Sequence, residues 1–211
     1  MMPPDNTPQF PPASFRRSDE TADEAFYTMP RFVVHIDDGA IRALTALLAK
    51  LLPPGGIYLD LMSSWRSPLP DTARPARVVG LGMNAAEMAD NPQLDAYLVH
   101  NLNVTPTLPL ATAEFDAAIC TVSVQYMTQP LAVFQEVNRV LKPGGLFVVS
   151  FSNRCFPTKA IAAWATGGDK EHQALVQSYF TAAGNWTTPQ TAAHTPRYSD
   201  PLYAVWAQKL A

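Results

Sequence analysis

The sequence predicts a single α/β domain with a doubly wound, mostly parallel sheet, and two patterns lead to this prediction. Short runs of residues are apolar throughout, and segments with the helical spacing of apolar residues separate them. Strands that are apolar on both faces are typical of a parallel sheet that helices cover on both sides. A chain of 211 residues is also long enough for one domain with a sizeable core.

The first predicted elements are a helix and a strand. Asp37 or Asp38 is a suitable N-cap, because a helical stripe of apolar residues follows at Ile41, Leu44, Leu47, Leu48 and Leu51. The run Pro-Pro-Gly-Gly at residues 53–56 ends this helix. Residues 57–62 then have the composition of a short buried strand.

The rest of the chain continues to alternate between strands and helices. Further strands of the sheet are expected at residues 76–82, 97–100, 115–122 and 146–151. A helix is expected at residues 83–89, and another begins at Pro130 and ends at the turn of residues 142–145. Two helical stretches and two strands complete the prediction, at residues 157–165, 169–182, 186–194 and 202–208.

The N-terminal residues 1–24 differ in composition from the rest. They are rich in Pro, Ser, Thr and acidic residues and have no periodic apolar pattern, so we expect a disordered or loosely attached arm. The folded domain is expected to cover residues 25–211. Because the chain shows no secretory or transit signal and no apolar run long enough to span a bilayer, we expect a cytoplasmic protein.

The composition excludes several classes of partner. A net charge of −3 gives no electrostatic footprint for nucleic acid and does not favour an anionic membrane surface. The two cysteines, Cys120 and Cys155, are too few for a disulfide framework. No spacing among the four histidines indicates a metal site. The sequence does not indicate an oligomeric state.

The predicted topology indicates where a ligand would bind. In an open α/β sheet, ligands lie at the carboxyl ends of the strands, where the strand order reverses. Candidate site residues therefore follow directly after each strand. This rule selects residues 60–67, 82–84, 100–103, 121–126 and 150–155.

Three stretches of the sequence resemble a known enzyme family. They are the apolar strand at 57–61, the run 108–110 followed by Glu-Phe-Asp at 114–116, and Phe134–Gly145 followed by an apolar strand. Together they are similar to class I S-adenosylmethionine-dependent methyltransferases of the small-molecule, methyltransferase type 11-like kind. The resemblance extends over about residues 26–211. The run Arg139–Gly145 is its most specific part.

The resemblance implies a Rossmann-like sheet of seven strands, whose last two form a hairpin that includes the antiparallel strand. It also implies a helix before the first strand that partly covers the cofactor, and residues 37–51 fit this role. The implied cofactor is S-adenosyl-L-methionine. The implied activity is methyl transfer to a small molecule, and the target atom is left open.

The loop after the first strand departs from the family pattern. Members of the family follow this strand with an acid and then spaced glycines, which let a ligand approach the backbone closely. Asp60 matches the acid, but Met62, Ser64 and Arg66 stand at the glycine positions, with Ser63 between them. Arg66 is either a partner for the carboxylate of the cofactor or a solvent-exposed residue. Prolines in residues 67–75 allow at most a very short helix there.

The next two strand ends also depart from the pattern. Gly82 stands where the family places an acid that binds the ribose, and Met83 and Asn84 follow it. Asn84 could accept from a hydroxyl, but we favour a role as N-cap of the next helix. After the third strand, Asn101 is a candidate acceptor for the adenine amino group, and its alternative is a polar loop residue. Leu102 and Thr121 complete the predicted cofactor-binding set.

Two residues are candidates for the catalytic chemistry. His35 is the best general-base candidate because the ordinary pKa of histidine is near 6.5. It alternates with apolar residues, so a structural role for this histidine is equally open. Tyr126 follows the fourth strand and is expected to shape the pocket.

Two classes of function follow from these patterns. The leading hypothesis is S-adenosylmethionine-dependent methyl transfer to an unidentified small molecule. The alternative is a non-catalytic binding or interaction protein that has kept this fold and lost methyl transfer, which the missing glycines and the Pro-rich arm favour. Another reaction of the same cofactor is a third hypothesis.

Overall fold

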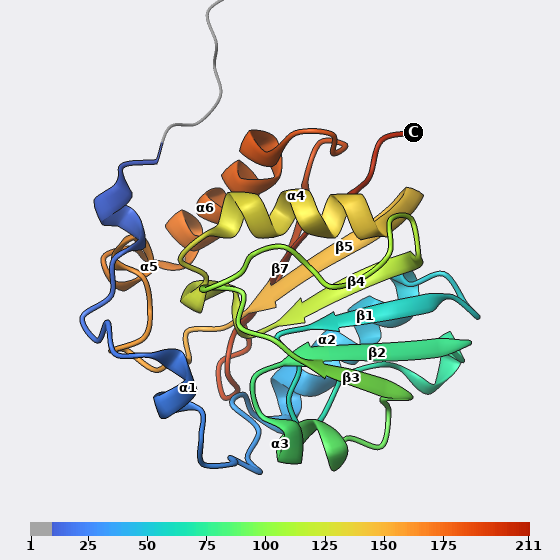
Figure 1. Ribbon diagram of the computed structural model, residues 1–211, viewed down its shortest axis with the longest axis horizontal. Coiled ribbons are helices and arrows are strands. Elements are labelled where there is room, and N and C mark those ends of the chain that lie inside the picture. The colour runs from blue at the N-terminus through green and yellow to red at the C-terminus, as the bar shows by residue number, and fades with distance from the viewer. Residues whose placement is uncertain (1–9) are drawn as a thin grey trace, which may run out of the picture.

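The computed structural model describes residues 10–211, which form one seven-stranded sheet in the order β3-β2-β1-β4-β5-β7-β6 (Figure 1). The five strands β1 to β5 are parallel, and β7 runs antiparallel to both of its neighbours. The α/β class, the seven strands and the C-terminal hairpin are therefore confirmed. The strands are β1 (Ile57–Leu61), β2 (Arg77–Gly82), β3 (Ala96–Val99), β4 (Phe115–Thr121), β5 (Leu141–Phe151), β6 (Gln190–His194) and β7 (Leu202–Gln208).

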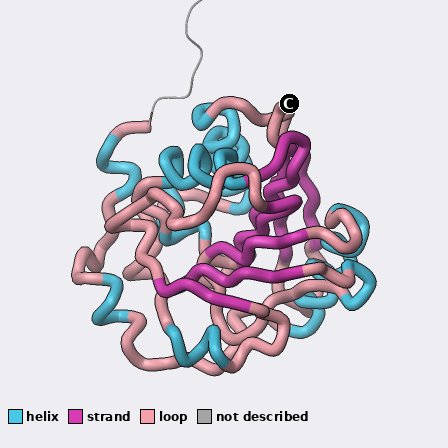
Figure 2. Tube along the Cα trace, turned by 45° about the vertical axis from the view of Figure 1, so that its right-hand side comes forward, coloured by secondary structure: helices cyan, strands magenta, loops and turns pink. Residues whose placement is uncertain are grey.

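Helices lie on both faces of this sheet (Figure 2). On one face, α4 (Pro130–Val140) and α6 (Asp169–Ala183) bury Phe134 and Phe180 in a large apolar cluster. On the other face, α2 (Asp38–Leu51) packs its predicted stripe, including Leu44 and Leu48, against a second cluster. Asp37 is the N-cap of α2, because its side chain accepts a hydrogen bond from the backbone of Ala40.

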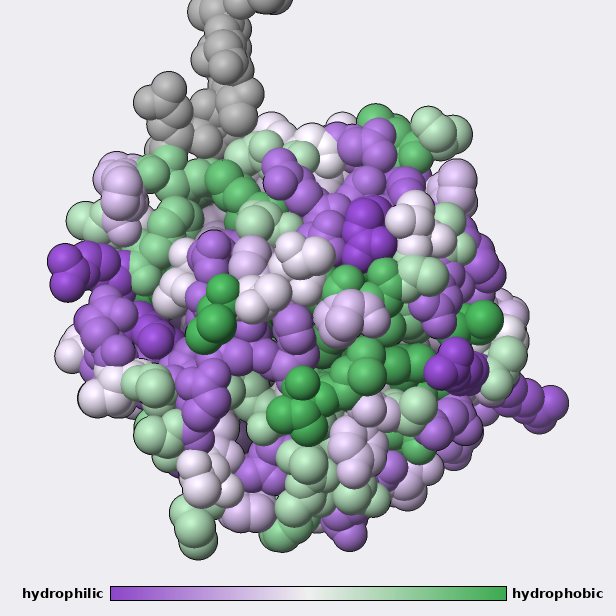
Figure 3. Space-filling model, in the orientation of Figure 1, coloured by the Kyte–Doolittle hydropathy of each residue, from purple (hydrophilic) through white to green (hydrophobic). Residues whose placement is uncertain are grey.

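The remaining helices are short. They are α1 (Asp23–Phe26), α3 (Ala85–Ala89) and α5 (Ala162–Ala165), with the 3₁₀ turns η1 (Pro12–Phe15), η2 (Asp71–Ala73) and η3 (Val124–Tyr126). The one-turn η2 is the helical part of residues 67–75, in agreement with the prolines there. In the view of Figure 1, no helix of residues 10–211 lies in front of β1, β2 and β3. Figure 3, in the same orientation, shows hydrophobic side chains on the surface over these strands.

The junction of α4 and β5 is held by the residues that carried the family resemblance. Arg139 binds the carboxylate of Glu136 through Nε and Nη2, and its Nη1 and Nη2 donate to the carbonyl oxygens of Leu110 and Leu108. Lys142 binds both carboxylate oxygens of Asp116. These contacts fix the loop before β4 against the end of α4, so this motif has a structural role here.

Part of the predicted arm is folded, which corrects the expectation for residues 1–24. Residues 1–9 lie outside the described part of the chain. Phe10 and Phe15 pack against the ring of Tyr179 on α6, with centroid distances of 5.5 and 6.3 Å. Lys159 is fully buried and lies 3.5 Å from Asp23. Two aromatic side chains and a buried cation therefore attach residues 10–24 to the domain. The sequence has no periodic apolar pattern that would predict these contacts.

Several element ends differ from the prediction. β5 begins at Leu141, before the predicted glycine turn, because Leu141 pairs with Phe115 across a register shift. β6 begins at Gln190, and Trp186 forms an isolated bridge with Lys209 instead. Within residues 10–211, helices with the length and apolarity needed to cross a membrane are absent.

Candidate functional site

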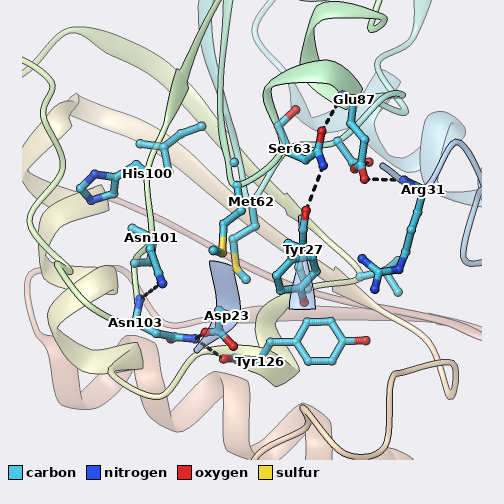
Figure 4. A pocket seen from close by; sticks show the side chains of 18 of the residues that line it. Asp23, Tyr27, Arg31, Met62, Ser63, Glu87, His100, Asn101, Asn103 and Tyr126 are labelled. Carbon is cyan, nitrogen blue, oxygen red and sulfur yellow. Dashed lines mark hydrogen bonds between the residues drawn. The ribbon is translucent and has the colours of Figure 1, made fainter. Parts of the chain in front are cut away.

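A cavity lies at the carboxyl ends of β1, β2 and β4, as the topology predicts (Figure 4). Segments from the N-terminal region and from the loops after β1, β2, β3 and β5 surround it. All of the predicted site residues except Asp60 and Arg66 line this cavity. They are His35, Met62, Ser63, Ser64, Gly82, Met83, Asn84, Asn101, Leu102, Thr121 and Tyr126.

Asp60 lies beneath the loop that follows β1 and not in this cavity. It is 3% exposed, and its carboxylate accepts hydrogen bonds from the hydroxyls of Ser63 (2.7 Å) and Ser67 (2.6 Å). Burial raises the pKa of Asp60 to about 6, although the two serine hydroxyls act in the opposite direction. Its role in this structure is to hold the loop in place.

The loop itself has a strained backbone at Met62. This residue stands at a family glycine position and has a φ of 57°, the left-handed conformation that glycine adopts without steric cost. Val122, after β4, has a φ of 50° although it is β-branched. Both residues line the cavity. Strained residues of this kind gather at ligand-binding sites, where the surrounding structure holds them in place.

Gly82 is required by the path of this loop. A Cβ atom at position 82 would lie 2.2 Å from the carbonyl oxygen of Ser63. The loop is held there because the backbone N–H of Ser63 donates to the carbonyl of Leu81 at 2.9 Å. The loop after β1 therefore occupies the space that an acidic side chain at position 82 would need.

Glu87 brings a carboxylate to the same region, and the sequence prediction missed it. Its side chain lines the cavity and is 7% exposed. One oxygen accepts from the hydroxyl of Ser64 at 2.5 Å and the other from the backbone N–H of Arg31 at 2.7 Å. Glu87 follows Asn84 by three residues, which is the spacing of a helix capping box, so the sequence pattern points to a structural role.

Asn84 caps α3, as the prediction favoured. Its side-chain oxygen accepts from the backbone N–H groups of Ala86 and Glu87. Its amide nitrogen donates to the carbonyl oxygen of Tyr27 at 2.9 Å. Asn84 thus links the N-terminal segment to the end of β2, and both of its side-chain polar atoms have protein partners.

The two predicted catalytic residues differ in their surroundings. His35 is exposed on one side, but the protein packed around its ring lowers its pKa, mainly by desolvation. Its ring meets that of Phe156 edge to face at 5.2 Å. Tyr126 is buried, and its hydroxyl accepts from the backbone N–H of Phe156 at 2.8 Å. Burial raises the pKa of Tyr126 to about 12, so this residue stays protonated at neutral pH.

Comparison with known proteins agrees with this fold. A family model described as a methyltransferase domain matches residues 66–149, from the end of the unusual loop to β5. The strand order of the sheet also matches the methyltransferase fold. Residues 66–149 are thus similar to methyltransferase domains, over less than half of the chain.

A curated protein to which this chain is similar is the malonyl-[acyl-carrier protein] O-methyltransferase of Marinomonas sp. (strain MWYL1). The two are 28% identical over 109 residues, which is 48% of this chain and 40% of the relative. The match thus spans less than half of the relative's length.

Solved structures share the fold at low sequence identity. A Burkholderia thailandensis 1,6-didemethyltoxoflavin-N1-methyltransferase, solved with bound 1,6-didemethyltoxoflavin and S-adenosylhomocysteine, has a TM-score of 0.60 at 15% identity over 83% of this chain and 80% of its own. A methyltransferase from Mesorhizobium loti has 0.55 at 18% identity, over 82% and 99%. The [4+2]-cyclase SpnF has 0.59 at 18% identity, over 89% and 92%.

Arg66 and Asn101 are placed differently from what the family resemblance implied. Arg66 lies outside the cavity, where its guanidinium pairs with Asp90 at 3.2 Å and stacks over Trp65 at 4.0 Å. The solvent-exposed alternative for Arg66 therefore describes this structure. Asn101 lines the cavity, but its amide nitrogen donates to Glu24 and its oxygen accepts from the backbone of Asn103.

Proposed function

We propose that this chain is an S-adenosylmethionine-dependent methyltransferase that acts on a small molecule. The observation that carries the proposal is the cavity at the carboxyl ends of β1, β2 and β4, in a chain whose residues 66–149 match a methyltransferase domain. Ligands of open α/β sheets bind at this position. The cavity has polar groups on an otherwise apolar wall, as small-molecule sites usually do.

The residues that line the cavity can hold the proposed cofactor through contacts that differ from those of the family pattern. Glu87 offers a shielded carboxylate inside the cavity, and its free lone pairs can accept from the ribose hydroxyls in place of an acid at position 82. Met62 and Leu102 offer apolar walls to the adenine ring. We propose Ser63, Ser64, Gly82, Met83 and Thr121 as further contacts of the cofactor.

Methyl transfer requires few catalytic groups from the protein itself. Bound S-adenosyl-L-methionine supplies an electrophilic methyl group, which leaves S-adenosylhomocysteine as the second product. The chain must orient the acceptor and remove a proton where the nucleophile carries one. His35 suits the second task because its lowered pKa keeps the ring neutral, and thus basic, at neutral pH. Tyr126, which stays protonated, suits the shaping of the acceptor pocket.

Detection of S-adenosylhomocysteine tests this proposal without a known acceptor. The protein is incubated with S-adenosyl-L-methionine carrying a labelled methyl group and with a protein-free extract of small metabolites. We expect extract-dependent formation of S-adenosylhomocysteine and a labelled product, both reduced in Glu87→Gln. Absence of both products, from a protein that binds the cofactor, would refute methyl transfer.

A second candidate function is binding without methyl transfer. Two observations favour it: none of the family's glycine positions after β1 holds glycine, and one protein of the same fold is described as a cyclase. The fold alone therefore does not fix the reaction. Cofactor binding without any S-adenosylhomocysteine product would select this function.

A further inference from the structure

Arg31 contributes a positive charge to the wall of the cavity. Its guanidinium lies over the ring of Phe26 at 4.5 Å and close to the rings of Phe156 (5.5 Å) and Tyr27 (5.6 Å). Figure 4 shows the guanidinium turned inward, towards Tyr27 and Tyr126. Three aromatic rings thus hold this side chain in one orientation.

The hydrogen bonds of this guanidinium are incomplete. Nη2 donates to the carbonyl oxygen of Phe26 at 2.8 Å, whereas Nη1 is shielded from solvent and has no partner within residues 10–211. Glu87 accepts from the backbone N–H of Arg31 and makes no ion pair with its side chain. A shielded charged donor without a partner is costly, so its presence in a cavity calls for an explanation.

The neighbouring cations are paired, which makes Arg31 stand out. Arg17, which also lines the cavity, binds Asp23 at 2.7 Å. The buried Lys159 lies between Asp19 (3.3 Å) and Asp23 (3.5 Å). Across the described chain, no carboxylate lies within ion-pair distance of the Arg31 side chain, so the charge of Arg31 is available to a ligand.

We propose that Arg31 binds a carboxylate of the methyl acceptor, so that the enzyme acts on carboxylic acids. This inference rests on the proposed function. A guanidinium presents parallel donors that match a carboxylate. The nearby carboxylate of Glu87 disfavours a dianion such as phosphate.

The position of Arg31 assigns this carboxylate to the acceptor and not to the cofactor. Its guanidinium packs against Phe156, which belongs to the loop after β5, and Phe156 also contacts His35 and Tyr126. The residues proposed to hold the cofactor instead follow β1, β2 and β3. Arg31 therefore belongs with the groups proposed to act on the acceptor.

Ligand-observed NMR tests the proposal with defined probes. The protein, with S-adenosylhomocysteine bound, is mixed with aryl and aliphatic carboxylic acids, each paired with its primary amide. We expect acids to bind better than their amides in the wild type. In Arg31→Met the affinity for acids falls at least about tenfold, and Arg31→Lys recovers part of it. Arg42→Met, at an exposed position of α2, serves as the control and keeps acid binding.

Three results would overturn the inference. Acids and amides could bind alike, no acid could bind, or Arg31→Met could weaken S-adenosylhomocysteine itself by about tenfold, which would assign Arg31 to the carboxylate of the cofactor. Thermal unfolding of each variant confirms that it is folded. If the wild type bound no S-adenosylhomocysteine, the proposed function would fail; if it bound and the acids failed, this inference alone would fail.

Discussion

Two regions that border the same sheet differ in how they match the family pattern. The junction of α4 and β5 follows the pattern, and the loop of residues 62–67 departs from it. The junction keeps the pattern, and Arg139 and Lys142 use it to bind backbone and carboxylate groups of the protein itself. The loop has lost every pattern glycine, and Met62 adopts the glycine-like conformation at a steric cost. The residues that hold these elements together thus follow the family pattern, whereas the loop beside the cavity departs from it at each glycine position.

The largest expected effect comes from restoring the family's acid. Gly82→Asp places a Cβ atom 2.2 Å from a backbone oxygen that cannot move freely, so we expect a loss of more than about 3 kcal/mol in the free energy of unfolding. Urea denaturation measures it. Gly168→Ala is the control, because its Cβ atom meets only the end of the Glu171 side chain. A Gly82→Asp protein of wild-type stability would show that the loop is not fixed against β2.

A smaller effect is expected from the buried acid beneath the loop. Its folded pKa of about 6 lies above the ordinary value of 3.8, so the folded state holds its proton more tightly than the unfolded state. The stability contributed by this proton is present below about pH 4 and is lost as the pH rises towards 6. Relative to Asp60→Asn, the wild type should lose about 2–3 kcal/mol over this range.

Denaturation curves of both proteins at several pH values measure this difference. Asp71→Asn, at an exposed residue of η2, is the matched control and should follow the wild type. Parallel pH profiles of the wild type and Asp60→Asn would contradict a raised pKa.

The junction should respond in stability and not in ligand binding. Arg139→Ala removes several hydrogen bonds, but its side chain is 32% exposed, so we expect a loss of about 1–2 kcal/mol. The affinity of the folded variant for S-adenosylhomocysteine should equal that of the wild type. Denaturation measures the free energy of unfolding, and calorimetry measures the affinity for S-adenosylhomocysteine. A loss of affinity in a folded variant would contradict this difference between the junction and the loop.

The smallest expected effect is the titration of His35. Desolvation lowers its pKa below the ordinary 6.5, so His35 should lose its proton at lower pH than an exposed histidine. Proton NMR of the imidazole ring, assigned with His35→Gln, follows this titration. A pKa above the ordinary value would remove the argument that His35 is a neutral base at physiological pH.

Much of the fold could be predicted from the sequence because its signals are local. Asp37 and Asn84 cap helices where the pattern places them, and prolines limit the segment after the loop to η2. The folded part of the arm could not be predicted, because Phe10 and Phe15 pack against a helix far away in the sequence.

The position of the cavity could be predicted from the sequence, but its individual contacts could not. The position follows from the sheet topology, because the cavity lies at the carboxyl ends of the strands. The role of Glu87 depends on a loop that closes over Gly82, and no spacing rule contains that contact. Arg66 fits the family position of a ligand contact, yet a nearby acid, Asp90, binds it outside the cavity.

We propose that the altered loop and Glu87 together form a cofactor site. Calorimetric titration of S-adenosylhomocysteine into the wild type, Glu87→Gln and Arg66→Ala tests it most directly. We predict binding by the wild type, a loss of about tenfold or more in Glu87→Gln, and no change in Arg66→Ala. A folded wild type that does not bind, or a Glu87→Gln variant with wild-type affinity, would contradict the claim.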